Sequence, residues 1–211
     1  MMQPPATFYQ WTLPPLVLAS ASPRRRELLT ALGLSFEVLP ADLDEALLLS
    51  QNPHATTPQA QVECLAKAKA QAVQRQYPQQ SQQALVLAAD TMVVLEGQGL
   101  GKPVDEADAC AMLRGLQGRR HSVWSAVALA YGQAPCRCNS RETRVWMRCL
   151  TDRQIERYVA TGEPMDKAGS YAIQGQGSLL IERIEGCYYN VVGLSLPLLA
   201  EMLEAMGYAA G

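Results

Sequence analysis

Three consecutive arginines, Arg24 to Arg26, stand directly after Ser22 and Pro23. Proline suits the first turn of a helix, where its missing N–H would have no partner anyway, and serine is a favoured N-cap residue. The free N–H groups of a helix start, the positive end of its dipole and the guanidinium groups would then meet at one place, which suits a polyphosphate. The alternative is a helix start whose basic side chains are merely solvated. This stretch alone leaves both interpretations open.

One aspartate, Asp90, interrupts the most apolar segment of the chain, residues 84–95. A buried carboxylate without a partner is costly, so Asp90 needs a counter-charge, a function or both. The acidic group Asp42, Asp44 and Glu45 and several lysines could lie beside it, which favours a functional site. A structural explanation stays open, because Asp90 could instead pair with a core lysine or cap a loop.

A glycine-rich stretch from Glu96 to Pro103 has some features of a phosphate-binding loop. It departs from that motif because Glu96 stands where glycine is needed, and Pro103 replaces the serine or threonine that would hold magnesium. A hairpin turn at residues 97–99 fits the sequence better. We expect this turn to be followed by Lys102, facing the same site as the other charged residues.

The composition of the whole chain limits its function classes. A chain of 211 residues with 48% hydrophobic and 18% charged residues is typical of a globular protein with a substantial core. The net charge of −2 argues against a general nucleic-acid binder. An anionic substrate would therefore be held by a local cluster of basic groups.

The location of the protein is predicted from patterns that the sequence lacks. No signal-peptide pattern is visible, and no apolar stretch approaches the ~20 residues that a membrane span requires, so we expect a cytoplasmic protein without a membrane partner. Its six cysteines should then be free thiols. With only two histidines and no CxxC pair, a zinc site is not expected.

The hydrophobic pattern predicts a mixed α/β chain without the regular alternation of a doubly wound sheet. Residues 1–15 are expected to form a mobile or peripheral arm, and residues 46–56 a loop. Strands are predicted at residues 16–19, 35–39, 84–95, 122–131, 143–150, 178–184 and 189–192. Helices are predicted at residues 24–31, 57–77, 105–116, 152–162 and 196–206.

Short motifs that occur together and in order give the chain a family resemblance. It resembles the Maf family of nucleoside triphosphate pyrophosphatases over residues 16–206. The matching motifs are LASASPRR (18–25), DE (44–45), LAKAKA (65–70), ADT (89–91), GKP (101–103), GRRHSV (118–123) and DKAG through IQG (166–175).

The resemblance implies one pyrophosphatase domain at residues 16–211, after an N-terminal extension at residues 1–15. Its fold would be an elongated mixed β-sheet with flanking helices, forming two lobes around a deep cleft, similar to inosine triphosphate pyrophosphatases. The implied activity is hydrolysis of a nucleoside triphosphate between the α and β phosphates, with a divalent cation, Mg²⁺ or Mn²⁺. A homodimer is possible by the same analogy.

The resemblance also assigns roles to individual residues. Asp90 would be the general base, acting with Glu45 and Lys102, and both carboxylates would bind the cation. Base selection falls on Arg24, Thr91 and Gln174. The phosphate-binding residues are Ser20, Arg24, Arg25, Lys69 and Lys102.

Three positions depart from the family pattern. Cys64 stands where arginine is expected, Ala88 where glycine is common and Ser125 where threonine is common. None of the three removes a proposed catalytic group, although Cys64 could weaken a contact on the long helix.

Three functional hypotheses follow. The Ser-Pro-Arg-Arg start together with Ile-Gln-Gly is similar to the motifs of the family branch that acts on dTTP and UTP. The amide of Gln174 could both donate to and accept from the edge of uracil or thymine. The sister branch acting on 7-methyl-GTP is the first alternative. A nucleotide-binding regulator of cell division without turnover is the second, and the intact set of Glu45, Asp90 and Lys102 argues against it.

Overall fold

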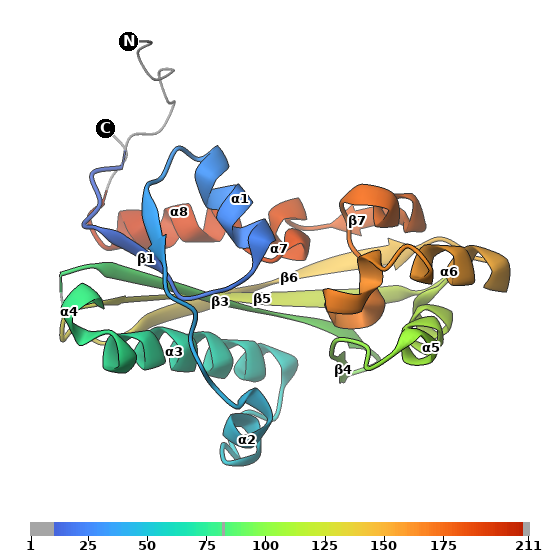
Figure 1. Ribbon diagram of the computed structural model, residues 1–211, viewed down its shortest axis with the longest axis horizontal. Coiled ribbons are helices and arrows are strands. Elements are labelled where there is room, and N and C mark those ends of the chain that lie inside the picture. The colour runs from blue at the N-terminus through green and yellow to red at the C-terminus, as the bar shows by residue number, and fades with distance from the viewer. Residues whose placement is uncertain (1–10, 82, 209–211) are drawn as a thin grey trace, which may run out of the picture.

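A computed structural model of the chain describes residues 11–81 and 83–208 (Figure 1). Most of the predicted arm, residues 1–10, lies outside the described residues, whereas Trp11 and Leu13 pack against the core. All six cysteines are free thiols. Over the described ranges, no helix combines the length and apolar character needed to cross a membrane.

The molecule is organised on a seven-stranded mixed sheet with the order β2-β1-β3-β5-β6-β7, and β4 pairs with β3. The first three strands in this order are parallel, and every other pairing is antiparallel. Three long strands make the sheet elongated, which confirms the predicted fold class (Figure 1). The strands are β1 (Leu16–Leu18), β2 (Phe36–Val38), β3 (Leu85–Leu95), β4 (Gln98–Leu100), β5 (Arg120–Tyr131), β6 (Arg137–Met147) and β7 (Ile181–Glu185).

Helices cover both faces of this sheet (Figure 1). The long α3 (Pro58–Gln76) lies along one face. The Thr57 hydroxyl caps its start by accepting a hydrogen bond from Ala60 N. Small side chains such as Ala66, Ala88 and Ala128 fill that interface, so helix and sheet pack closely. The other helices are α1 (Pro23–Ala31), α2 (Glu45–Ser50), α4 (Pro78–Ser81), α5 (Glu106–Leu116), α6 (Asp152–Val159), α7 (Tyr188–Val192) and α8 (Leu196–Ala205).

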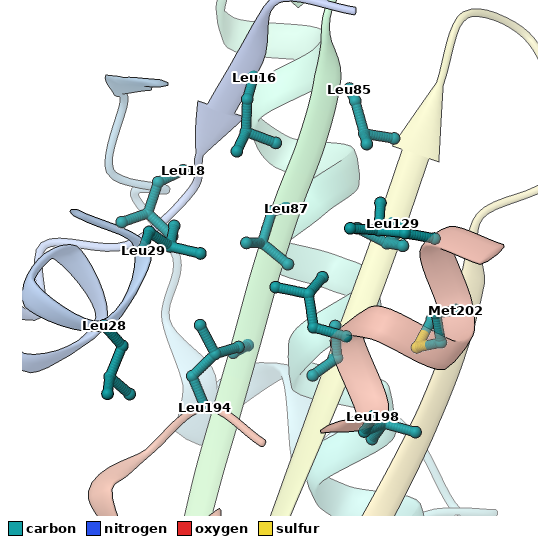
Figure 2. Packing of buried hydrophobic residues seen from close by; sticks show 14 of the residues in the cluster. Leu16, Leu18, Leu28, Leu29, Leu85, Leu87, Leu129, Leu194, Leu198 and Met202 are labelled. Carbon is teal, nitrogen blue, oxygen red and sulfur yellow. The ribbon is translucent and has the colours of Figure 1, made fainter. Parts of the chain in front are cut away.

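The opposite face carries a leucine-rich core, shown in Figure 2. Leu18 of β1, Leu28 of α1, Leu87 of β3 and Leu198 of α8 converge there. A third cluster fills the far end of the sheet, where Leu113 of α5 is fully buried. The two faces together fix β3 at the centre of the molecule, with Asp90 midway along it.

The sheet has a gap beside the middle of β3. The strand β1 pairs with Leu85–Leu87, and β4 pairs with Val93–Leu95. Among the described residues, 88–92 therefore have a strand neighbour only on the β5 side. The space that a further strand would fill is left open at Asp90 and Thr91.

Three sequence-based expectations about elements are wrong. The expected loop at 46–56 contains α2, which begins where the Asp44 side chain accepts from Leu47 N. The expected strand at 189–192 is α7, because the buried amide of Asn190 donates to the carbonyl oxygens of Val123 and Arg141. The strand predicted at 178–184 begins only at Ile181, after a 3₁₀ helix.

The start of α1 also differs in detail from the prediction. The helix begins at Pro23, one residue before the predicted range and in the first turn where proline is favoured, but the Ser22 side chain makes no capping hydrogen bond.

Candidate active site

A cavity of about 1030 Å³ opens at the gap in the sheet. The start of α1, α2, α3, the middle of β3 and the loop after β4 line it, and it is completed by residues 166–174 and the end of α7. All nine predicted site residues line this one cavity: Ser20, Arg24, Arg25, Glu45, Lys69, Asp90, Thr91, Lys102 and Gln174.

The centre of the cavity is one lysine between two carboxylates. Lys69 Nζ of α3 lies 2.6 Å from Asp90 Oδ1 and 2.8 Å from Glu45 Oε1. The Asp90 side chain is 9% exposed and Lys69 14%, whereas Glu45 is 50% exposed. Lys69 is thus the counter-charge that the sequence required for Asp90. A purely structural pair would not need the second, solvent-facing carboxylate that α2 directs at the same ammonium group.

These carboxylates are also the oxygen donors that a hard cation would use. No group of three or more His, Cys, Asp or Glu side chains in the described ranges is arranged to hold a metal ion. Mg²⁺ is commonly bound by one or two carboxylates together with waters and substrate phosphates. Glu45 and Asp90 fit a cation that arrives with a polyphosphate better than a resident metal.

Arg25 is a buried residue of the cavity lining and is held by three hydrogen bonds. Its Nε donates to Gly193 O at 2.8 Å, Nη1 to Ser20 Oγ at 2.9 Å and Nη2 to Thr91 Oγ1 at 3.3 Å. Thr91 Oγ1 in turn lies 2.7 Å from Ser125 Oγ, so the shorter serine at 125 still completes the network. Burial lowers the pKa of Arg25, and the nearby Asp90 charge opposes that effect.

The fixed orientation of this guanidinium has a functional consequence. Among the described residues Arg25 forms no direct ion pair with a carboxylate, so its charge is available to an anion in the cavity. Because three protein acceptors already hold the group, Arg25 joins α1, β3 and the segment after α7 as well as facing the cavity.

Arg24 lines the cavity beside Asp166. Its Nη1 is 3.7 Å from Asp166 Oδ2, and Asp166 Oδ1 also accepts from Lys167 Nζ at 2.5 Å. Asp166 and Lys167 both line the cavity, although sequence reasoning gave them no role. The signal was available, since both belong to the DKAG motif. The charges of Asp166 and Lys167 nearly cancel, whereas Arg24 and Lys102 add positive charge to the cavity.

Tyr171 is a third cavity residue that the sequence did not single out. Its hydroxyl lies 2.7 Å from Nε2 of His121, and both side chains are buried. The rings meet edge to face, with centroids 5.3 Å apart. The GRRH motif thus supplies a histidine that supports the cavity wall from behind.

We expect His121 to make stability depend on pH. Burial lowers the pKa of His121 from 6.5 to about 4, because a second proton would place charge where Nδ1 has no hydrogen-bond partner. The unfolded chain therefore binds a proton between pH 6.5 and 4 that the folded chain does not, so stability falls as pH falls. The loss from pH 7 to 5 should be about 2 kcal/mol.

Denaturant unfolding at pH 7 and pH 5 measures this effect. His121→Gln should flatten the dependence, whereas the same change at the exposed His54 should leave it as in the wild type. An unaltered dependence in His121→Gln would assign the effect to other groups.

Comparison with known proteins places the chain in a family. The dTTP/UTP pyrophosphatase of Pelotomaculum thermopropionicum is 48% identical over 194 residues, 92% of this chain and 97% of that protein. The enzyme of the same name from Moorella thermoacetica is 51% identical over 193 residues, 91% and 95% of the two chains. The Staphylococcus aureus Ham1 structure aligns with 90% of this chain and 98% of its own at 15% identity, with a TM-score of only 0.48. The family model described as Maf-like protein matches residues 15–206, and the chain belongs to that family.

Proposed function

We propose that this chain hydrolyses dTTP and UTP to the nucleoside monophosphate and pyrophosphate. The observation that carries the proposal is the placement of Lys69 between Asp90 and Glu45 in a cavity that also gathers Arg24, Arg25 and Lys102. Cations to neutralise a triphosphate and a carboxylate to accept a proton are what cleavage of a phosphoanhydride requires. The relatives named dTTP/UTP pyrophosphatase align over nine-tenths of the chain, which supports the same reaction.

In this mechanism the arginines and lysines hold the triphosphate, and Asp90 orients the attacking water. Asp90 accepts the proton as water adds to phosphorus and the bond between the α-phosphate and the pyrophosphate group breaks. Lys69 pairs with the Asp90 carboxylate before substrate binds and can turn to the phosphates when substrate enters. Glu45 and Asp90 would hold the divalent cation, Mg²⁺ or Mn²⁺, which supplies further charge neutralisation on the triphosphate.

Base selection is assigned to Gln174. Its side chain is half-buried at the cavity wall, beside Ile173 and Ala172. The amide offers one donor and one acceptor, which matches O4 and N3–H of uracil and thymine. Cytosine reverses that pattern, so the same amide would discriminate against dCTP.

A panel of nucleotides with product analysis tests the reaction. We expect dTTP and UTP to give monophosphate and pyrophosphate in equal amounts, and EDTA to abolish the activity, since the carboxylates then have no cation to share with the phosphates. A diphosphate with orthophosphate would contradict the reaction type. Preference for 7-methyl-GTP would assign the chain to the sister branch, and tight dTTP binding without products would make it a non-catalytic binder.

A further inference from the structure

The side chain of Glu163, just after α6, accepts three hydrogen bonds. Its Oε1 accepts from Tyr158 Oη at 3.0 Å and from Gly177 N at 2.9 Å, and its Oε2 accepts from Gln176 N at 3.0 Å. Two of the donors are backbone groups in the first turn of the 3₁₀ helix Gly175–Leu180. The carboxylate therefore holds the start of this short helix.

Tyr158 extends this arrangement to the residues just before that 3₁₀ helix. Its hydroxyl donates to Glu163 and accepts from Ala172 N at 3.1 Å. The segment 172–177, which we call the Gln174 segment, is thus bonded at its start to Tyr158 and at its end to Glu163. The two anchors are bonded to each other, so the ends of the segment cannot move independently.

Two glycines allow the Gln174 segment to come this close. Gly175 has a φ of +64°, and a Cβ there would lie 2.8 Å from Glu163 Oε2. A Cβ on Gly177 would lie 2.3 Å from Ala172 O and 2.6 Å from Tyr158 Oη. The chain therefore carries glycine on both sides of Gln176, where any side chain would push the segment off its two anchors.

The carboxylate is held in its ionised form. Burial by itself would raise the pKa of Glu163, but the hydrogen bonds from Gly177, Gln176 and Tyr158, together with the charge of Lys167, outweigh it and lower the pKa. An ionised carboxylate can accept from all three donors at once, which a glutamine amide cannot.

Glu163 itself stands apart from the main cavity. It borders a smaller adjoining pocket of about 270 Å³, which Arg24 and Gln174 also line. Asp90, Lys69 and Glu45 are not among the residues around that pocket. A change at Glu163 can therefore act on the base-reading side chain without touching the groups assigned to the chemistry.

We propose that Glu163 is a positioning residue for base selection: with Tyr158 it fixes both ends of the Gln174 segment, and so fixes where the Gln174 amide meets the edge of the base. The inference rests on the proposed function, because it assumes that Gln174 reads the base. A fixed amide can reject a base whose donors and acceptors are reversed, whereas an amide on a loosened segment can rotate or shift to suit either base.

The test is the ratio of kcat/KM for dTTP to kcat/KM for dCTP in the wild type and in Glu163→Gln. The glutamine keeps one acceptor oxygen but turns an NH₂ group toward the loop N–H groups. We expect the ratio to fall ~10-fold, mainly through a higher KM for dTTP, with kcat changed by less than ~3-fold. Glu156→Gln, an exposed change on α6, is the matched control and should keep the wild-type ratio.

The outcomes separate this inference from the proposed function. A wild type that does not hydrolyse dTTP would overturn the function whatever Glu163 does. If the wild type discriminates and a folded Glu163→Gln keeps its ratio, or loses kcat equally for both nucleotides, the positioning role is wrong. If Glu163→Gln does not melt cooperatively, Tyr158→Phe decides, since it removes only the hydroxyl: a lower ratio supports the inference and an unchanged one overturns it.

Discussion

Replacing Asp90 with asparagine is expected to lower the turnover of dTTP by at least ~10²-fold while leaving the protein folded. Asparagine keeps the shape of the side chain but cannot take the proton of the attacking water, and it brings one negative charge fewer to a cation. Stability should hold or rise, because a 9% exposed carboxylate leaves the centre of an apolar strand while Lys69 retains Glu45 as a partner.

A melting curve and a rate measured on one preparation check this expectation. Asp152→Asn is the matched control, because that carboxylate is exposed at the start of α6. Among the described contacts its ion pair is with Arg114, which is also at the surface. Wild-type turnover in Asp90→Asn would make Asp90 a structural aspartate and would return the role of general base to Glu45.

Replacing Lys69 with methionine is expected to damage both stability and activity. Asp90 and Glu45 approach the same ammonium group, so its removal leaves two carboxylates facing each other with no cation between them. Removing one partner of a buried ion pair typically destabilises by about 3 kcal/mol or more. Turnover should fall as well, because the triphosphate loses a cation deep in the cavity.

A double variant separates the charge effect from simple loss of packing. Lys69→Met with Asp90→Asn leaves only the half-exposed Glu45, so much of the stability should return although activity does not. Lys67→Met is the control, since Lys67 lies two residues away on α3 and points to a different side. Denaturant unfolding gives the comparison; stability losses that merely add in the double variant would mean that Lys69 and Asp90 are not coupled.

The hydrophobic pattern of the sequence predicted those helices and strands that are long and have a regular period. The apolar run with Asp90 is β3, and Thr57 begins α3 as its sequence indicates. The six-residue α2 was missed because its apolar residues, 46–49, are consecutive and none is buried, so they show no helical period. The helix α7 was taken for a strand because its conformation depends on Asn190 bonding to β5 and β6, which are remote in sequence.

The members of the candidate site were predicted, but not their contacts. Family motifs and the isolated Asp90 selected nine side chains, and all of them line one cavity. Whether Lys69 or Lys102 would pair with Asp90 depended on how α3 docks on the sheet. The roles of Glu163 and Tyr158 were not visible because both bond to backbone N–H groups, whose position a residue pattern does not record.

The gap beside β3 bears on how the protein avoids aggregation. An unpaired stretch of strand backbone can recruit a strand from another molecule, and natural proteins deter this with charged side chains and short edges. Here residues 88–92 are the edge without a strand neighbour, Asp90 places a charge within it, and Lys69 and Glu45 lie against that charge. The charges assigned to the phosphates, the cation and the attacking water would thus also shield the central strand from intermolecular pairing. A variant that neutralises these side chains no longer has to bury charge, but it loses the charges that deter pairing with a strand of another molecule.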